Sequence, residues 1–204
     1  MTLRYVALGD SYTIGTALDA PAERWPDQLV TRCAGLDLIA NLGVNGFTSR
    51  DVIETELPRL ASLSPDFASI LVGVNDVVQG VPPPDFEANA STILEALLAH
   101  LPRNRVVAVS TPDYTVTPQG AAYGDPAVQS AAIRRYNATL ARLAAERGIA
   151  FVDIHDLSLG ATADRSLVAA DGLHPSGAQY RLWVDRIAPV VDRLLADEAP
   201  QRTA

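Results

Sequence analysis

The first residues in the chain that could do chemistry are Asp10 and Ser11, which place a carboxylate and a hydroxyl side by side after a short apolar run. That run, residues 3–8, has the composition of a buried strand. A serine at the carboxyl end of such a strand lies in the crevice where open α/β sheets bind ligands. A plain turn is the competing interpretation, because Gly, Asp and Ser are common in turns.

Polar residues and a glycine also follow the other apolar runs. They are Gly43 and Asn45 after residues 36–40, Asn75 and Asp76 after residues 67–72, and Asp171 and His174 beyond residues 149–154. The carboxyl ends of parallel strands meet at one edge of a sheet, so we expect these residues to converge in one crevice. A hydroxyl together with an imidazole and carboxylates has the functional groups for nucleophilic and acid–base chemistry.

The scaffold that must position these groups alternates between strands and helices. Apolar runs of strand length lie at residues 3–8, 36–40, 67–72, 106–109 and 149–154. Helical spacing predicts helices at residues 21–34, from Thr48 or Ser49 to a break or kink at Pro58, at residues 85–101, from about 126 to 147, and from Pro175 onward. This alternation predicts parallel βαβ units and hence a three-layer α/β/α sandwich.

We expect the sheet to be five-stranded, parallel and flavodoxin-like, with strand order 2-1-3-4-5. The chain has no internal repeat or interdomain linker, so residues 1–204 are expected to form one domain, with a frayed tail from about residue 197.

Composition restricts the class of protein further. A hydrophobic fraction of 48% in 204 residues is ample for a core, and a formal charge of −8 argues against nucleic acid and anionic membranes as partners. The single cysteine, Cys33, excludes an intramolecular disulfide, and no run approaches the length that crosses a bilayer. The N-terminal run is too short for a secretory signal, so we expect a cytoplasmic protein without metal or cofactor. The oligomeric state is open.

Four sequence blocks, in order, resemble those of the SGNH hydrolases, the GDSL esterase/lipase superfamily. The blocks are Gly9-Asp10-Ser11, Gly43 within Asn-Leu-Gly-Val-Asn-Gly, Gly73-Val74-Asn75-Asp76 and Asp171-Gly172-Leu173-His174. Each block is short, but the ordered set spans almost the whole chain and is highly specific. Tyr12 departs from the leucine of the family's name-giving motif, at a position that varies within the family.

The resemblance implies a serine hydrolase that cleaves carboxylic esters through an acyl-enzyme. Ser11 would be the nucleophile, His174 its general base, and Asp171 the carboxylate that orients the imidazole. The oxyanion would be bound by the backbone N–H groups of Ser11 and Gly43 and by the side-chain amide of Asn75. Asp10 and Asp76 are expected to brace the backbone, Asn45 could contact substrate or not, and Asn41 is expected to be a loop residue.

Several alternatives stay open at this stage. His155, followed by Asp156, is the rival for the base, and His100 is expected only to complement a helix dipole. A non-catalytic flavodoxin-like or glycan-binding module is the competing function. The aperiodic stretch 111–125 predicts a loop, in which Tyr114 and Tyr123 could line the substrate pocket or simply lie at the surface. We expect a small-molecule ester with a small or medium acyl group, because no large apolar lid is visible.

Overall fold

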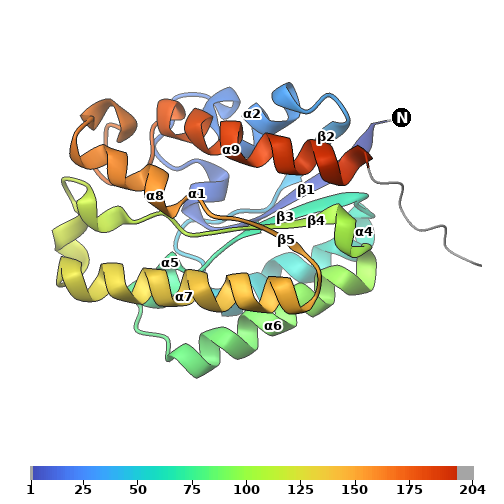
Figure 1. Ribbon diagram of the computed structural model, residues 1–204, viewed down its shortest axis with the longest axis horizontal. Helices are drawn as coiled ribbons and strands as arrows, with labels where there is room; N and C mark the ends of the chain where they lie inside the picture. The colour runs from blue at the N-terminus through green and yellow to red at the C-terminus, as the bar shows by residue number, and fades with distance from the viewer. Residues whose placement is uncertain (1, 197–204) are drawn as a thin grey trace, which may run out of the picture.

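The computed structural model describes residues 2–196, along which strands and helices alternate (Figure 1). Within that range five parallel strands form one sheet in the order β2-β1-β3-β4-β5, which confirms the expected flavodoxin-like arrangement. The strands are β1 (Leu3–Gly9), β2 (Leu36–Asn41), β3 (Phe67–Leu71), β4 (Val106–Val109) and β5 (Ala150–Val152). Strand β5 is shorter than the apolar run that predicted it.

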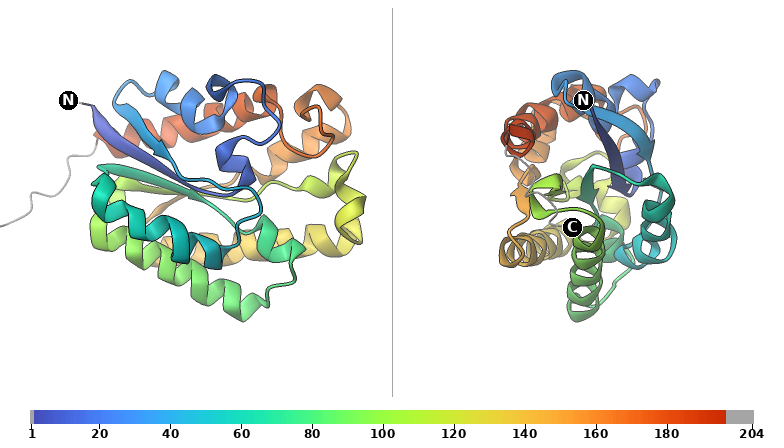
Figure 2. Two further views of the ribbon diagram at one scale, coloured as in Figure 1. Left: turned by 180° about the vertical axis from the view of Figure 1, so that it is seen from behind. Right: turned by 90° about the vertical axis from the view of Figure 1, so that its right-hand side faces the viewer.

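Helices cover both faces of this sheet (Figure 2). Helices α2 (Trp25–Arg32) and α9 (Gly177–Ala196) pack together on one face, and α6 (Pro83–His100) and α7 (Pro126–Glu146) pack together on the other. Helix α2 is preceded by a 3₁₀ turn at Pro21–Glu23, and α9 begins two residues later than the predicted Pro175. The result is the predicted three-layer sandwich.

The core occupies the space between the sheet and both helical layers. Its largest fully buried side chains include Tyr5 and Phe67 from the sheet and Trp25 and Trp183 from the helices. Burying a large apolar side chain contributes about 1.5–3 kcal/mol. Strands β1 and β3 are neighbours inside the sheet and are buried along most of their length, and the first candidate site residues follow them directly.

Residues 49–63, which also cover the face with α6 and α7, form an irregular helical segment. It begins with α3 (Ser49–Asp51), which Thr48 caps, passes through a π-helical turn at Val52–Glu56 and a 3₁₀ turn around Pro58, and ends with α4 (Leu60–Leu63). The predicted cap and the predicted disturbance at Pro58 are both confirmed. A π-helical turn carries an extra residue, which changes the direction in which later side chains point.

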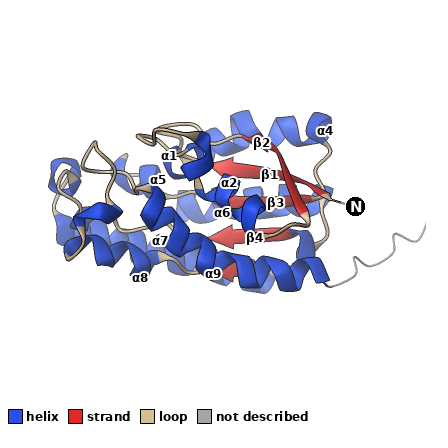
Figure 3. Ribbon diagram, turned by 90° about the horizontal axis from the view of Figure 1, so that it is seen from above, coloured by secondary structure: helices blue, strands red, loops and turns tan. Residues whose placement is uncertain are grey.

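All five strands point toward one edge, where short helices and loops gather (Figure 3). Helices α1 (Ser11–Ile14), α5 (Val74–Val78) and α8 (His155–Ser158) begin within three residues of the ends of β1, β3 and β5. The predicted loop 111–125 follows β4 and contains two 3₁₀ turns, Tyr114–Val116 and Gly120–Tyr123. The tail expected to fray lies outside the described residues.

Candidate active site

The turn after β1 presents Ser11 at the start of helix α1. Gly9 has φ +147°, and a Cβ there would lie 2.2 Å from the carbonyl oxygen of Leu71, so this position requires glycine. Asp10 caps the helix, because its Oδ1 accepts the backbone N–H of Tyr12 at 3.0 Å. The turn therefore fixes Ser11 as the first residue of α1, with its side chain largely buried at the positive end of the helix.

Residues at the end of β2 hold the serine turn from the side. Asn41 Nδ2 donates to the Thr13 carbonyl at 2.7 Å, and Asn41 Oδ1 accepts the Gly43 N–H at 3.1 Å. The expectation that Asn41 is a loop residue was wrong, since it is the last residue of β2 and joins that strand to α1. A Cβ at Gly43 would lie 2.7 Å from Ile14 N, so glycine allows the two segments to pack closely.

The turn after β3 places Asn75 and Asp76 on α5. Asn75 Nδ2 donates one hydrogen bond to the Phe47 carbonyl at 2.9 Å. Asp76 is fully buried and accepts the backbone N–H of Ser49 at 2.9 Å and the Ser49 hydroxyl at 2.5 Å. Burial raises the pKa of Asp76, although the bonds from Ser49 oppose that shift. Asp76 thus braces the backbone, as expected.

His174 and Asp171 form a tight pair on the turn before α9. His174 Nδ1 lies 2.5 Å from Asp171 Oδ2, while Asp171 Oδ1 accepts the backbone N–H groups of Leu173 and His174 at 2.9 and 3.0 Å. Partial burial alone would raise the pKa of Asp171, but the hydrogen bonds from His174 and from these N–H groups hold it below its ordinary value. The carboxylate is therefore ionised and fixes the orientation of the ring, which leaves Nε2 for chemistry.

Tyr12 also contacts the imidazole. Its ring meets that of His174 edge to face at 5.7 Å, and it meets Trp183 in the same manner at 6.2 Å. Such aromatic contacts contribute about 0.5–1.5 kcal/mol beyond area burial. The tyrosine that departs from the leucine of the family motif is thus packed between the core and the candidate base.

One cavity of about 230 Å³ brings these elements together. It is lined by Ser11, Tyr12, Asn45, Gly46, Val74, Asn75, Val78, Tyr114, Tyr123, Leu173 and His174. Asn45, whose role the sequence left open, lies in the lining. Gly43 does not, because it packs behind the serine turn. The apolar members Val74, Val78 and Leu173 were missed, although each is adjacent or close in sequence to a predicted site residue.

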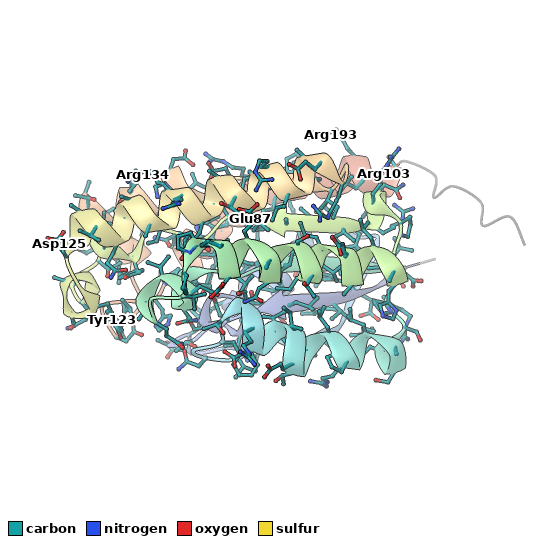
Figure 4. The ribbon with its side chains drawn as sticks, turned by 90° about the horizontal axis from the view of Figure 1, so that it is seen from below. Glu87, Arg103, Tyr123, Asp125, Arg134 and Arg193 are labelled. Carbon is teal, nitrogen blue, oxygen red and sulfur yellow. The ribbon has the colours of Figure 1, made fainter. Side chains whose placement is uncertain are left out.

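Tyr114 and Tyr123 form one wall of this cavity. Their rings contact edge to face at 5.8 Å, and the buried Tyr114 donates its hydroxyl to Gln129 Oε1 at 3.1 Å. Figure 4 shows Tyr123 at the end of the molecule, close to Asp125 and the start of α7. Loop 111–125 therefore lines one side of the cavity with two tyrosine rings. Tyr114 is buried and hydrogen-bonded, and Tyr123 is exposed.

The rival histidine, His155, does not line this cavity. Its Nε2 lies 3.6 Å from Asp113 Oδ2, and it lines a separate cavity of about 220 Å³ beside α7 and β5. His100 lies at the end of α6. Of the three histidines in the chain, His174 is therefore the one placed with Ser11.

Residues 2–196 contain neither a metal-binding cluster nor a membrane-spanning helix. Across residues 2–196, no three His, Cys, Asp or Glu side chains gather in an arrangement that could hold a metal ion. Over the same range, no helix has both the length and the apolar content needed to cross a membrane.

A serine and an imidazole line one cavity of an α/β/α sandwich, and a carboxylate holds the imidazole by its other nitrogen. These are the groups that a serine hydrolase uses. Comparison with known proteins identifies the family. The chain belongs to the GDSL-like Lipase/Acylhydrolase family, whose model matches residues 7–182. It is accordingly a serine ester hydrolase. No curated protein matches the chain.

Solved structures share the fold at low sequence identity. A variant of Axe2, an acetyl xylan esterase from Geobacillus stearothermophilus, is 18% identical with a TM-score of 0.71, and the match covers 93% of this chain and 94% of that one. A member of the lipolytic protein G-D-S-L family from Veillonella parvula is 20% identical with a TM-score of 0.74, covering 93% and 98%. A putative lipolytic protein of the same family from Desulfitobacterium hafniense is 22% identical with a TM-score of 0.73, covering 92% and 98%.

Proposed function

We propose that Ser11, His174 and Asp171 are the catalytic triad of an esterase for small and medium acyl groups. The observation that carries the proposal is that Ser11 and His174 line one cavity while Asp171 holds His174 Nδ1 at 2.5 Å. These residues come from the two ends of the chain, and Asp171 and His174 bond to each other across one short turn. A structural turn would not need an imidazole held in one tautomer at a cavity that a serine also lines.

The reaction follows the acyl-enzyme route. Ser11 Oγ attacks the ester carbonyl while His174 Nε2 removes the hydroxyl proton, and the imidazolium that forms is stabilised by the Asp171 carboxylate. When the tetrahedral intermediate collapses, His174 donates that proton to the leaving alcohol. A water molecule then attacks the acyl-serine with His174 again as base, which releases the acid and restores Ser11.

Two donors are best placed for the oxyanion. The N–H of Ser11 is at the first position of α1, where helical N–H groups have no partner within the helix. Asn75 uses one amide hydrogen on Phe47, which leaves the other for the cavity it lines. Gly43, the third donor in our assignment, does not line the cavity and has its N–H on Asn41 Oδ1, so its contribution requires that bond to be shared with the oxyanion.

The size and lining of the cavity support the choice of acyl group. Ligand pockets for drug-sized molecules span roughly 300–1,000 Å³, and this cavity of about 230 Å³ is smaller. Val74, Val78 and the two tyrosines supply apolar contacts, while Asn45 supplies a polar one. That Axe2 is an acetyl xylan esterase is consistent with a small acyl group here as well.

Labelling with a fluorophosphonate tests the proposal. We expect the wild-type protein to be modified at Ser11, and Ser11→Ala to lose both labelling and hydrolysis of p-nitrophenyl esters while its circular dichroism stays unchanged. Labelling that persists on another serine of the variant would overturn the assignment.

The cytoplasmic location is part of the same proposal, on the grounds of a single cysteine and an acidic composition, and cell fractionation tests it.

A further inference from the structure

Two buried carboxyl groups hold the serine turn from behind. Glu56 is 1% exposed, and its Oε2 accepts the backbone N–H of Gly9 at 2.9 Å. Asp10 is fully buried, and its Oδ1 accepts the N–H of Tyr12. The second oxygen of each group, Glu56 Oε1 and Asp10 Oδ2, is buried without a hydrogen bond to any described residue. Gly9 and Tyr12, the residues on either side of the Asp10-Ser11 pair, are thus each held by a buried acid.

Glu56 is the last residue of the π-helical turn at Val52–Glu56. Within the turn Val52–Glu56, Glu54 is exposed and pairs with Arg50 at 2.7 Å, whereas Glu56 points inward to β1. The two glutamates are two residues apart and face opposite environments. Such turns occur often at functional sites.

Burial of an ionised carboxylate with an unpartnered oxygen is costly, so the proton is retained. Burial, together with the negative charge of Asp10, raises the pKa of Glu56 to about 9 against the opposing effects of the Gly9 N–H and of Arg59. Burial likewise raises the pKa of Asp10 to about 8, and Asp76 adds to this shift while the Tyr12 N–H opposes it. At neutral pH, Glu56 is therefore an uncharged acid.

We propose that Glu56 is a positioning residue, which in its protonated form holds the Gly9 N–H and so keeps the Ser11 turn in the geometry needed for attack. When the proton leaves, the buried charge draws water or displaces the π-helical turn, and the nucleophile loses its alignment. A misplacement of about 1 Å can cost roughly 10²-fold in rate. This inference rests on the proposed role of Ser11.

The Glu56→Gln variant tests the role of the proton, because it removes the ionisable group and keeps the shape of the side chain. Glutamine keeps an oxygen for the Gly9 N–H and cannot ionise. We expect its kcat at neutral pH to stay within about threefold of the wild type, a difference below about 1 kcal/mol. The wild-type kcat should fall as the pH rises through about 9. This step should be absent from the Glu56→Gln enzyme, in which any remaining decline follows the titration of Asp10 near pH 8. Glu54→Gln, in the same turn, is the matched control and should retain the wild-type alkaline decline.

Glu56→Leu tests the hydrogen bond itself. It removes the acceptor for Gly9, so we expect kcat to fall by roughly 10²-fold with little change in KM. Should this variant not fold, the rate of fluorophosphonate labelling against pH, compared between the wild type and Glu56→Gln, tests the positioning role, because it reports Ser11 reactivity directly. An unchanged alkaline decline in Glu56→Gln would overturn the proposal, even if Ser11 remained the labelled residue.

Loss of the Glu56 proton is also expected to lower the stability of the fold. The folded-state pKa of Glu56 lies above its unfolded value, so its contribution to stability is complete below the unfolded pKa and is lost as pH rises through about 9. We expect the Tm of the wild type to fall over this range more than that of Glu56→Gln, with Glu54→Gln following the wild type. Parallel Tm curves for all three proteins would contradict the assigned protonation.

Discussion

Two histidine–carboxylate pairs lie near the carboxyl edge of the sheet, and they differ in what surrounds them. The side chains of His174 and His155 are equally exposed, at 12%, and each faces an aspartate. In the first pair the nitrogen–oxygen distance is 2.5 Å and the Asp171 side chain is 33% exposed. In the second pair the distance is 3.6 Å and the Asp113 side chain is 1% exposed.

The carboxylate of the second pair, Asp113, already accepts hydrogen bonds from residues next to it. Asp113 accepts the N–H and the hydroxyl of Thr115 and the hydroxyl of Ser130, and Ser130 in turn accepts a bond from Arg134. Ser130 therefore gives its proton to a carboxylate and not to an imidazole. A Ser, a His and an Asp in proximity can act as a catalytic triad only when the imidazole lies between the other two.

The largest expected difference between the pairs is in turnover. His174→Ala should lower kcat by about 10⁴- to 10⁶-fold, because it removes the base for both half-reactions. His155→Ala should leave kcat within about threefold of the wild type. Steady-state kinetics on a p-nitrophenyl ester measures both. If the two phenotypes were exchanged, the Asp171–His174 turn would be structural and the triad assignment wrong.

Each histidine–carboxylate pair has an asparagine nearby. Asn75 lines the cavity of His174, and Asn137 lines the cavity of His155. Asn75→Ala should cost about 10²–10³ in kcat, and Asn75→Asp at least as much, because an acceptor-only carboxylate would repel the oxyanion. Asn137 uses its amide on both backbone groups of Thr111, so Asn137→Asp should lower stability and spare kcat. Near-wild-type kcat in Asn75→Asp would show that Asn75 is not an oxyanion donor.

Asp113 and Asp171 are expected to differ in stability. Burial would raise the pKa of Asp113, but the nearby His155 imidazole and the hydrogen bonds from Ser130 and Thr115 lower it well below its ordinary value. Its stabilising effect is then present above the unfolded pKa and is lost as pH falls through the folded one. Asp113→Asn should lower the free energy of unfolding at neutral pH by about 1–3 kcal/mol and flatten the acid limb in urea titrations.

The matched change, Asp171→Asn, should lower turnover by about 10⁴-fold with a smaller loss of stability, because its carboxylate is partly exposed. Equal stability losses in the two variants would contradict the distinction between a structural and a catalytic pair.

The smallest expected effect concerns loop 111–125, which connects the two histidine–carboxylate pairs. Asp113 of the second pair lies near its start, and Tyr123, which lines the cavity of His174, lies near its end. Tyr123 is 42% exposed, so Tyr123→Ala removes only part of a hydrophobic contact. We expect a loss of about 1 kcal/mol, roughly fivefold in kcat/KM, on medium-chain esters and little change on the acetyl ester. A chain-length series measures this, and an unchanged profile would exclude Tyr123 from the acyl pocket.

Much of the fold follows from local patterns in the sequence. Short apolar runs separated by helical spacing are enough to predict βαβ units, because each run must be buried between helical layers. The same patterns place Ser11, Asn75 and His174 after strands, hence at one edge. They do not predict the π-helical turn at Val52–Glu56, because its helical periodicity is interrupted by one residue.

Part of the site could not be predicted, because it depends on contacts between distant residues. The sequence by itself determined which residue types stand after which strand, and its four ordered blocks determined the family. Only the tertiary structure decided that Asn41 joins β2 to α1, that Gly43 packs behind the serine turn, and that Glu56 reaches Gly9 from 47 positions away. The physical reason is that strand order and helix docking bring these groups together, and no local pattern encodes the distances between them.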